Sequence, residues 1–153
     1  MKITVFTPTY NRCQTLFRLY ESLCQQSYSN YEWIIVDDGS TDKTDEQIQR
    51  IAKTALFPIR YYKKENGGKH TAHNLAIEKA SGDYFFCVDS DDYLSSDALL
   101  AISEVVQRFP SVVGVVALKA CANGELLSDK LPHVQCVDSL IELNERYRCR
   151  GEF

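Results

Sequence analysis

The chain has 153 residues, of which 44% are hydrophobic and 25% charged, and its net charge is −4. This composition is that of one globular domain, and it excludes a disordered chain, a collagen and a long coiled coil. The mild acidity argues against nucleic acid as a partner, and no apolar run approaches the roughly 18 residues that cross a membrane.

Short apolar runs alternate with helical patterns along most of the chain. The runs are rich in β-branched and aromatic residues, which predicts strands at Lys2–Thr7, Glu32–Val36, Ile59–Lys63, Tyr84–Val88 and Val112–Ala120. Apolar residues at helical spacing predict helices around residues 16–24, 48–52, 72–76, 98–106 and 140–147. This alternation predicts an α/β domain with a Rossmann-like, mainly parallel sheet and helices on both faces.

The six cysteines include no Cys-x-x-Cys pair, and the first residues do not resemble a signal peptide. Disulfides and zinc sites are therefore not expected, and free thiols suit a reducing compartment. We expect one domain over residues 1–153 in a cytoplasmic protein.

Polar residues follow each of the first four predicted strands. These segments are Pro8-Thr9-Tyr10-Asn11-Arg12, Asp37-Asp38-Gly39-Ser40-Thr41-Asp42, Glu65-Asn66-Gly67-Gly68-Lys69 and Asp89-Ser90-Asp91-Asp92. In parallel α/β sheets, ligands bind beyond the carboxyl ends of the strands. The sequence therefore predicts a ligand site at this edge of the sheet.

The acidic segment Asp89–Asp92 is the strongest indication of a metal. Three carboxylates within four residues repel one another unless a cation lies among them. Oxygen ligands indicate Mg²⁺ or Mn²⁺, with water and ligand phosphates completing the coordination. The alternative is a solvated acidic turn that caps a helix over Ser95–Phe109, and Asp92 is expected to be structural.

The other loops indicate a nucleotide. A carboxylate at Asp37 or Asp38 suits a ribose or a base, although both residues also suit a turn and a helix cap. Lys69 could neutralise a diphosphate beside Gly67-Gly68, whereas Lys63 and Lys64 fit a solvated turn equally well. Tyr10 is either a core aromatic or a platform for a base. The chain contains neither G-x-G-x-x-G nor a P-loop motif, which disfavours dehydrogenases and P-loop enzymes.

Taken in order, these loops resemble the inverting family-2 glycosyltransferases, which have the GT-A fold. The likeness covers residues 3–110 and rests on four segments. They are Thr7–Arg12, Val36–Asp42, Asn66-Gly67-Gly68 with Ala72 and Asn74, and the Asp-x-Asp motif Asp89-Ser90-Asp91. Each segment is weak alone, but the ordered set is specific.

The resemblance implies transfer of a sugar, with inversion, from a nucleotide-diphosphate donor, most often a UDP sugar. Tyr10 would stack on the base, Asp38 would hydrogen-bond it and Asp89 would lie near the ribose. Asp91 would bind the Mn²⁺ or Mg²⁺ ion that stabilises the leaving diphosphate. The donor-binding residues implied are Pro8, Thr9, Tyr10, Arg12, Asp38, Gly67, Lys69, Asp89 and Ser90.

The family also sets expectations about partners. The acceptor would be a glycan or a lipid-linked sugar in polysaccharide biosynthesis, with peripheral attachment to the inner face of the membrane. An exposed sheet edge would allow a homodimer. His73 stands where many relatives have arginine, so no phosphate contact is assigned to it.

An inverting enzyme needs a general base, which in this family follows the Asp-x-Asp strand at a distance. Glu142, Glu145 and Glu152 are the carboxylates available near the end of the chain, and none is expected to serve. We therefore expect the base beyond Phe153 and the chain to be truncated before the acceptor-binding part. The alternative is a nucleotide-sugar-binding or interaction module without transfer activity. A nucleotidyltransferase is disfavoured because no glycine-rich loop follows the first strand.

Overall fold

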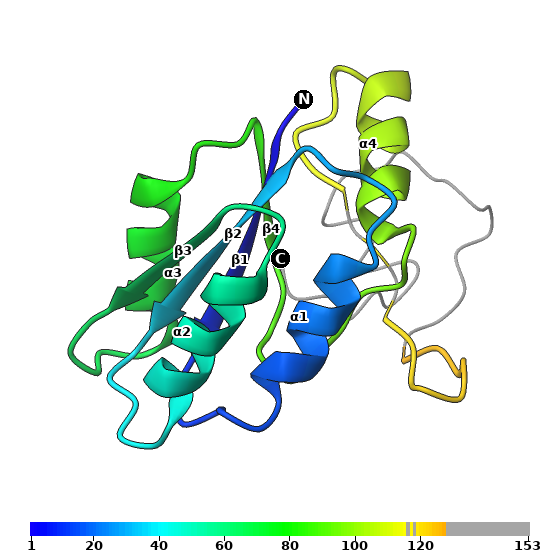
Figure 1. Ribbon diagram of the computed structural model, residues 1–153. Helices are drawn as coiled ribbons and strands as arrows, with labels where there is room; N and C mark the ends of the chain where they lie inside the picture. The colour runs from blue at the N-terminus through cyan, green and yellow to red at the C-terminus, as the bar shows by residue number, and fades with distance from the viewer. Residues whose placement is uncertain (116, 118, 128–153) are drawn as a thin grey trace. The chain divides into compact units, whose positions relative to one another are not determined.

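The computed structural model describes residues 1–115, 117 and 119–127. It divides into two compact units, Met1–Ser103 and Glu104–Phe153. Strands and helices alternate through the first unit (Figure 1). In chain order they are β1 (Ile3–Thr9), α1 (Leu16–Cys24), β2 (Tyr31–Asp37), α2 (Thr44–Thr54), β3 (Ile59–Lys63), α3 (Lys69–Lys79), β4 (Tyr84–Cys87) and α4 (Ala98–Arg108), whose last residues belong to the second unit.

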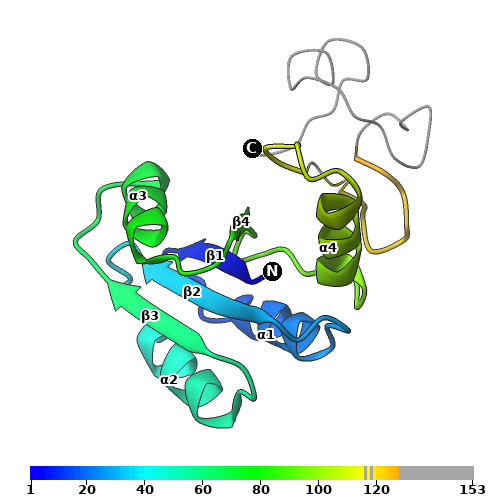
Figure 2. The same cartoon turned by 90° about the horizontal axis from the view of Figure 1, so that it is seen from above.

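The four strands form one parallel sheet in the order β3-β2-β1-β4. From β1 the chain moves outward through β2 to β3, and α3 then leads it back to β4 on the other side of β1. Figure 2 shows α1 and α2 on one face of the sheet and α3 on the other. The direction of winding therefore reverses between β1 and β4, and ligands of open α/β sheets bind at such a switch point.

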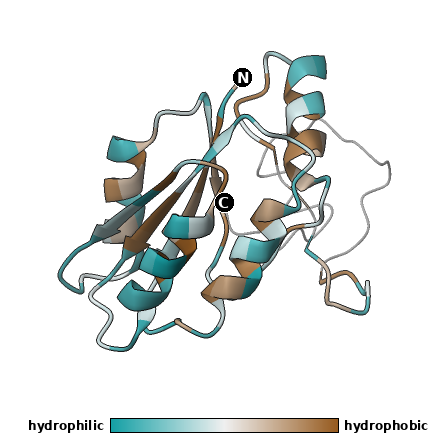
Figure 3. Cartoon of the chain, viewed as in Figure 1, coloured by the Kyte–Doolittle hydropathy of each residue, from teal (hydrophilic) through white to brown (hydrophobic). Residues whose placement is uncertain are grey.

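The core lies against the two central strands, in which every residue from Ile3 to Thr9 and from Tyr31 to Asp37 is buried. On one face, Phe6 and Ile34 pack with Ala72 and Ala76 of α3. The small alanines let this helix lie close to the sheet, and a fully buried side chain such as Phe6 contributes about 1.5–3 kcal/mol. Figure 3 shows the hydrophobic residues concentrated on the strands.

A buried carboxylate lies near the amino ends of the strands. Glu32 is 2% exposed and accepts hydrogen bonds from Lys2 Nζ at 2.9 Å and Arg60 Nη2 at 2.7 Å. Thr4 Oγ1 also donates to it at 2.7 Å, and the Ser81 amide at 3.0 Å. Burial by itself would raise the pKa of Glu32, but these bonds outweigh it and lower the pKa from 4.5 to about 2.

The structure confirms the first four predicted strands and the first four helices, with boundaries that differ by a few residues. α4 begins at Ala98, later than the predicted start at Ser95. No described cysteine forms a disulfide. Among the described helices, none is both long and apolar enough to cross a membrane.

The prediction of a strand over Val112–Ala120 is wrong where the structure describes this segment. Residues 112–115, 117 and 119 belong to no strand, and Ala120 makes only an isolated antiparallel bridge to Leu126. Val113 is fully exposed, so no sheet neighbour buries this residue. The predicted turn at Asn123-Gly124 is present, with Gly124 at φ 83°. The predicted helix Leu140–Tyr147 lies outside the described residues.

Candidate functional site

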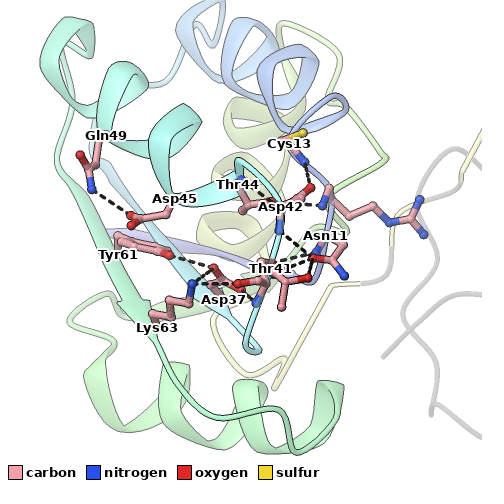
Figure 4. Close-up of polar contacts among 12 residues, drawn as sticks. Asn11, Cys13, Asp37, Thr41, Asp42, Thr44, Asp45, Gln49, Tyr61 and Lys63 are labelled. Atoms are coloured by element: carbon pink, nitrogen blue, oxygen red, sulfur yellow. Dashed lines mark hydrogen bonds and ion pairs between the residues drawn. The ribbon is translucent and has the colours of Figure 1, made fainter.

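The loops after β1 and β2 are tied together by Asn11. Its backbone N–H donates to Ser40 Oγ at 2.8 Å, and its side-chain Oδ1 accepts from the Thr41 amide at 2.9 Å (Figure 4). Asn11 has φ 53°, a left-handed conformation in which asparagine is enriched among non-glycine residues. The fixed turn places the next residue, Arg12, at the switch point.

Asp42 connects the start of α2 to the first loop. Its Oδ1 accepts from the amide and the hydroxyl of Thr44, as a helix-start carboxylate does. Its Oδ2 accepts from the Cys13 amide at 3.3 Å, and Thr44 Oγ1 accepts from the Arg12 amide at 3.2 Å. Asp42 thus binds the first residue of α2, whereas Lys43, at the N-cap position, makes no side-chain cap hydrogen bond (Figure 4).

Asp37 is fully buried and already surrounded by protein donors (Figure 4). Its carboxylate accepts from the Ser40 amide at 2.7 Å and from Tyr61 Oη at 2.8 Å, and Lys63 Nζ lies 4.0 Å away. Burial and the neighbouring carboxylate raise the pKa of Tyr61, so it remains a donor. Of the two roles that the sequence allows for Asp37, the structure therefore favours that of a turn residue over that of a ligand-binding carboxylate.

Asp38 holds the glycine loop after β3. Oδ1 accepts from Lys64 Nζ at 2.6 Å and from the Gly67 amide at 2.9 Å, and Oδ2 accepts from the Gly68 amide at 2.7 Å. Burial would raise the pKa of Asp38, but Lys64 and the two amides outweigh it and lower the pKa. A carboxylate has about four accepting positions, so Oδ2 retains one for a ligand.

Two glycines permit this close approach. Gly39 has φ 86°, and a Cβ there would lie 2.9 Å from the Asn66 backbone nitrogen. Gly68 has φ 91° at the start of α3. The amides of Gly67 and Gly68 thus donate to Asp38. The sequence instead suggested that this backbone would approach a phosphate.

Two ion pairs link the Asp-x-Asp segment to its neighbours at the switch point. Arg12 Nη2, from the loop after β1, lies 3.7 Å from Asp91 Oδ2, and both side chains are about half exposed. Lys69 Nζ, at the start of α3, lies 2.8 Å from Asp89 Oδ1. The structure therefore brings together four of the residues predicted for the site, from three different loops.

The remaining predicted residues lie at the same edge. Tyr10 is 49% exposed at the end of β1, which excludes the alternative of a core aromatic. Pro8, Thr9 and Ser90 are buried. Thr9 Oγ1 is buried and has no hydrogen-bond partner among the described residues, and a buried polar atom left unpaired costs about 1–3 kcal/mol.

The donor set suits a cation that shares its coordination with a ligand. Asp89 and Asp91 supply only oxygen atoms, and Asp91 is half exposed. Within the described part of the chain, no three His, Cys, Asp or Glu side chains are grouped to hold a metal by themselves. A Mg²⁺ or Mn²⁺ ion there would take its other ligands from water and phosphate, as these ions commonly do.

Sequence reasoning missed two organising residues. Lys64 was as compatible with a solvated turn as with the site, yet it neutralises Asp38. Asn11 belongs to the motif Thr7–Arg12, and its left-handed turn lies two residues after the end of the buried strand β1. His73 packs against Phe6 and Phe85, with ring centroids 5.4 and 5.2 Å away, which gives it a packing role.

Comparison with known families identifies the chain. The model of glycosyl transferase family 2 matches residues 4–148. The chain belongs to this family. It is 28% identical over 148 residues to the poly(ribitol-phosphate) beta-N-acetylglucosaminyltransferase TarS of Staphylococcus aureus, which covers 92% of this chain and 26% of TarS.

Solved structures agree with the family assignment. TarS 1-349 of S. aureus in complex with UDP superposes with a TM-score of 0.67 at 27% identity, over 76% of this chain and 38% of that one. The mannosyltransferase PcManGT from Pyrobaculum calidifontis, in complex with GDP-Man and Mn²⁺, gives 0.66 at 27% identity, over 69% and 32%. The predicted GT-A fold is thereby confirmed. The chain spans about a quarter of the length of TarS.

Proposed function

We propose that the described residues form the donor site of an inverting glycosyltransferase that uses a nucleotide-diphosphate sugar, with UDP as the expected nucleotide. One observation carries the proposal. The pairs Arg12–Asp91 and Lys69–Asp89 gather two carboxylates and two cations at the switch point of the sheet. A diphosphate and its metal need both signs of charge in one place. The UDP complex of TarS and the GDP-Man and Mn²⁺ complex of PcManGT support this assignment.

The base would bind between the first two loops. Tyr10 offers an exposed ring next to the end of β1, and stacking of a base on an aromatic ring contributes about 1–3 kcal/mol. Asp38 offers the free accepting position of Oδ2 to a base N–H. Gly67 contributes indirectly, by donating its amide to Asp38. Pro8 and Thr9 are buried at the end of β1 and support the backbone that carries Tyr10.

The ribose and diphosphate would lie along the Asp-x-Asp segment. Asp89 and Ser90 lie just beyond the end of β4, after Val88, and Asp89 pairs with Lys69 at the amino end of α3. Asp91 would hold Mn²⁺ or Mg²⁺, which when bound supplies positive charge to the departing diphosphate. Arg12 and Lys69 pair with the two carboxylates and would reach phosphate oxygens by rotating their half-exposed side chains.

The rest of the reaction belongs to the acceptor side. The acceptor hydroxyl must lose a proton to a general base, and the described residues carry none that we assign to this step. Glu142, Glu145 and Glu152 lie outside the described residues. We propose a glycan or lipid-linked acceptor reached from the cytoplasm at the inner face of the membrane. A nucleotide-sugar-binding module without transfer activity is the second candidate, because the described residues that we assign to the site all face the donor and include no general base.

Calorimetry with UDP tests the donor site. We expect wild-type protein to bind UDP more tightly with Mn²⁺ than with EDTA, and Asp91→Asn to lose that difference. Asp97→Asn removes the same charge from an exposed residue beyond the Asp-x-Asp segment, and it should behave as wild type. Equal Mn²⁺ dependence in Asp91→Asn and wild type would overturn the metal assignment, and absence of any UDP affinity would overturn the donor site.

Transfer is a separate measurement. Release of UDP from a UDP sugar, with and without added acceptor glycans, distinguishes the two candidates. Donor binding together with turnover supports the transferase. Binding without turnover, in this chain and in the longest protein that contains it, would favour the binding module.

A further inference from the structure

One side of α1 carries three polar side chains that are spaced four residues apart. They are Arg18 and Ser22 within the helix and Gln26 just after its last turn. Residues at this spacing lie on the same face of a helix. We refer to these three residues as the α1 polar stripe.

The α1 polar stripe binds the backbone of the segment that follows β4. Arg18 Nη2 donates to the carbonyl of Asp91 at 2.6 Å, and Ser22 Oγ accepts from the Leu94 amide at 3.1 Å. Gln26 makes two hydrogen bonds further along the chain, to the end of this segment and to the start of α4. It donates to the Ser95 carbonyl at 2.7 Å and accepts from the Leu99 amide at 3.1 Å.

These contacts give hydrogen-bond partners to a segment that lies outside regular secondary structure. β4 ends at Cys87 and α4 begins at Ala98, so the backbone between them lies outside regular secondary structure, although the Val88 amide still donates to the Phe6 carbonyl and the Asp92 amide to the Asp89 carbonyl. The bonds to the Leu94 and Leu99 amides are partly buried, and backbone polar groups withdrawn from water need such partners. Side chains about 70 residues earlier in the chain supply them, in the same order along α1 as along the segment.

Arg18 contacts the part of the segment that contains Asp91, the residue proposed to bind the metal. Besides its bond to the Asp91 carbonyl, its guanidinium lies over the Tyr93 ring, 4.6 Å from the centroid. Arg12 pairs with the Asp91 carboxylate, whereas Arg18 binds the main chain of the same residue. A metal would compete with Arg12 for the carboxylate but would leave the contact of Arg18 intact.

We propose that the α1 polar stripe positions Asp91 for the metal and diphosphate, with Arg18 as the principal positioning residue. The inference rests on the proposed donor site, and it adds residues that the resemblance to the family did not indicate. Groups that orient a metal ligand commonly change metal affinity by about 10- to 100-fold when they are removed.

The test measures Mn²⁺ affinity at saturating UDP, by electron paramagnetic resonance of the free ion, and UDP affinity in EDTA. Arg18→Met keeps the aliphatic stem and should weaken Mn²⁺ binding about tenfold. Arg18→Lys restores a donor and should recover part of the loss. Arg50→Met, at an exposed position of α2, is the matched control and should equal wild type. UDP affinity without metal should stay within about twofold in all variants.

Two results would overturn the proposal. One is Mn²⁺ affinity in Arg18→Met within about twofold of wild type. The other is an equal loss of metal-free UDP affinity, which would indicate general structural damage. Hydrogen exchange in the ligand-free protein gives a further readout, because the Leu94 amide donates to Ser22 Oγ and should exchange faster in Ser22→Ala, while the β2 amides do not change. Failure of wild type to bind Mn²⁺ would overturn the donor site itself, and the exchange result would still decide whether the α1 polar stripe holds the segment.

Discussion

Replacement of Glu32 by glutamine tests the charge network near the amino ends of the strands. The carboxylate is buried, and it pairs with Lys2 and Arg60 while Thr4 and Ser81 donate to it. Glutamine keeps the size and shape of the side chain but removes the charge. It leaves two cations without their counter-ion, and Lys2 and Arg60 are each about one-third exposed, so water relieves part of that cost.

The magnitude follows from the pKa of Glu32, which falls from 4.5 in the unfolded chain to about 2 in the folded one. Because the folded value is the lower one, the unfolded state binds the proton first as pH falls. The stabilisation is complete above about pH 5 and disappears progressively toward pH 2. A difference of this size corresponds to about 3 kcal/mol of unfolding free energy at pH 7.

Urea unfolding followed by circular dichroism measures this contribution. We expect Glu32→Gln to lower the unfolding free energy by about 3 kcal/mol at pH 7, and the gap to wild type to narrow as pH falls from 5 toward 2. Glu21→Gln, on the exposed side of α1, is the control and should lie within about 0.5 kcal/mol of wild type. A gap that stays constant between pH 7 and pH 3, or one no larger than that of the control, would refute the reasoning.

Two further predictions concern the site. Gly39→Ala puts a side chain on a residue with φ 86°, where its Cβ would lie 2.9 Å from the Asn66 backbone nitrogen. We therefore expect the unfolding free energy to fall by more than about 1 kcal/mol and UDP binding to weaken. An unchanged midpoint of urea unfolding would contradict this prediction. Tyr10→Ala should weaken UDP binding by about 1–3 kcal/mol in calorimetry, whereas Tyr10→Phe keeps the ring and should bind as wild type. Equal losses in the two Tyr10 variants would show that the hydroxyl, and not stacking, makes the contact.

The local pattern of the chain was sufficient for most of the secondary structure. Continuous apolar runs such as Ile34-Ile35-Val36 become central strands covered on both faces, and polar residues after each strand reach one edge of a parallel sheet. Where the structure describes the run at Val112–Ala120, it forms no strand, because a strand also needs a neighbour to pair with and hydrophobicity does not provide one. The ordered loops were also enough to indicate the family, which the family model confirms.

The site itself depended on long-range pairing. Asp37 and Asp38 are adjacent and chemically identical, yet one is enclosed by Tyr61 and Ser40 while the other keeps an accepting position beside the glycine loop. Strands alternate their faces, so neighbouring residues enter different surroundings, and a sequence pattern does not say which surroundings those are.

Strand order decided the rest. Placing β4 beside β1 brings Arg12 to Asp91, and it brings Arg18 of α1 to the backbone of the same residue. These partners are more than 70 residues apart in the chain, and nothing in their local sequence specifies the contact. Periodicity and turn chemistry act over a few residues and could be recognised from the chain alone. Charge pairing at the switch point exists only after the sheet is assembled, because the carboxyl ends of β1 and β4 meet only in the folded protein.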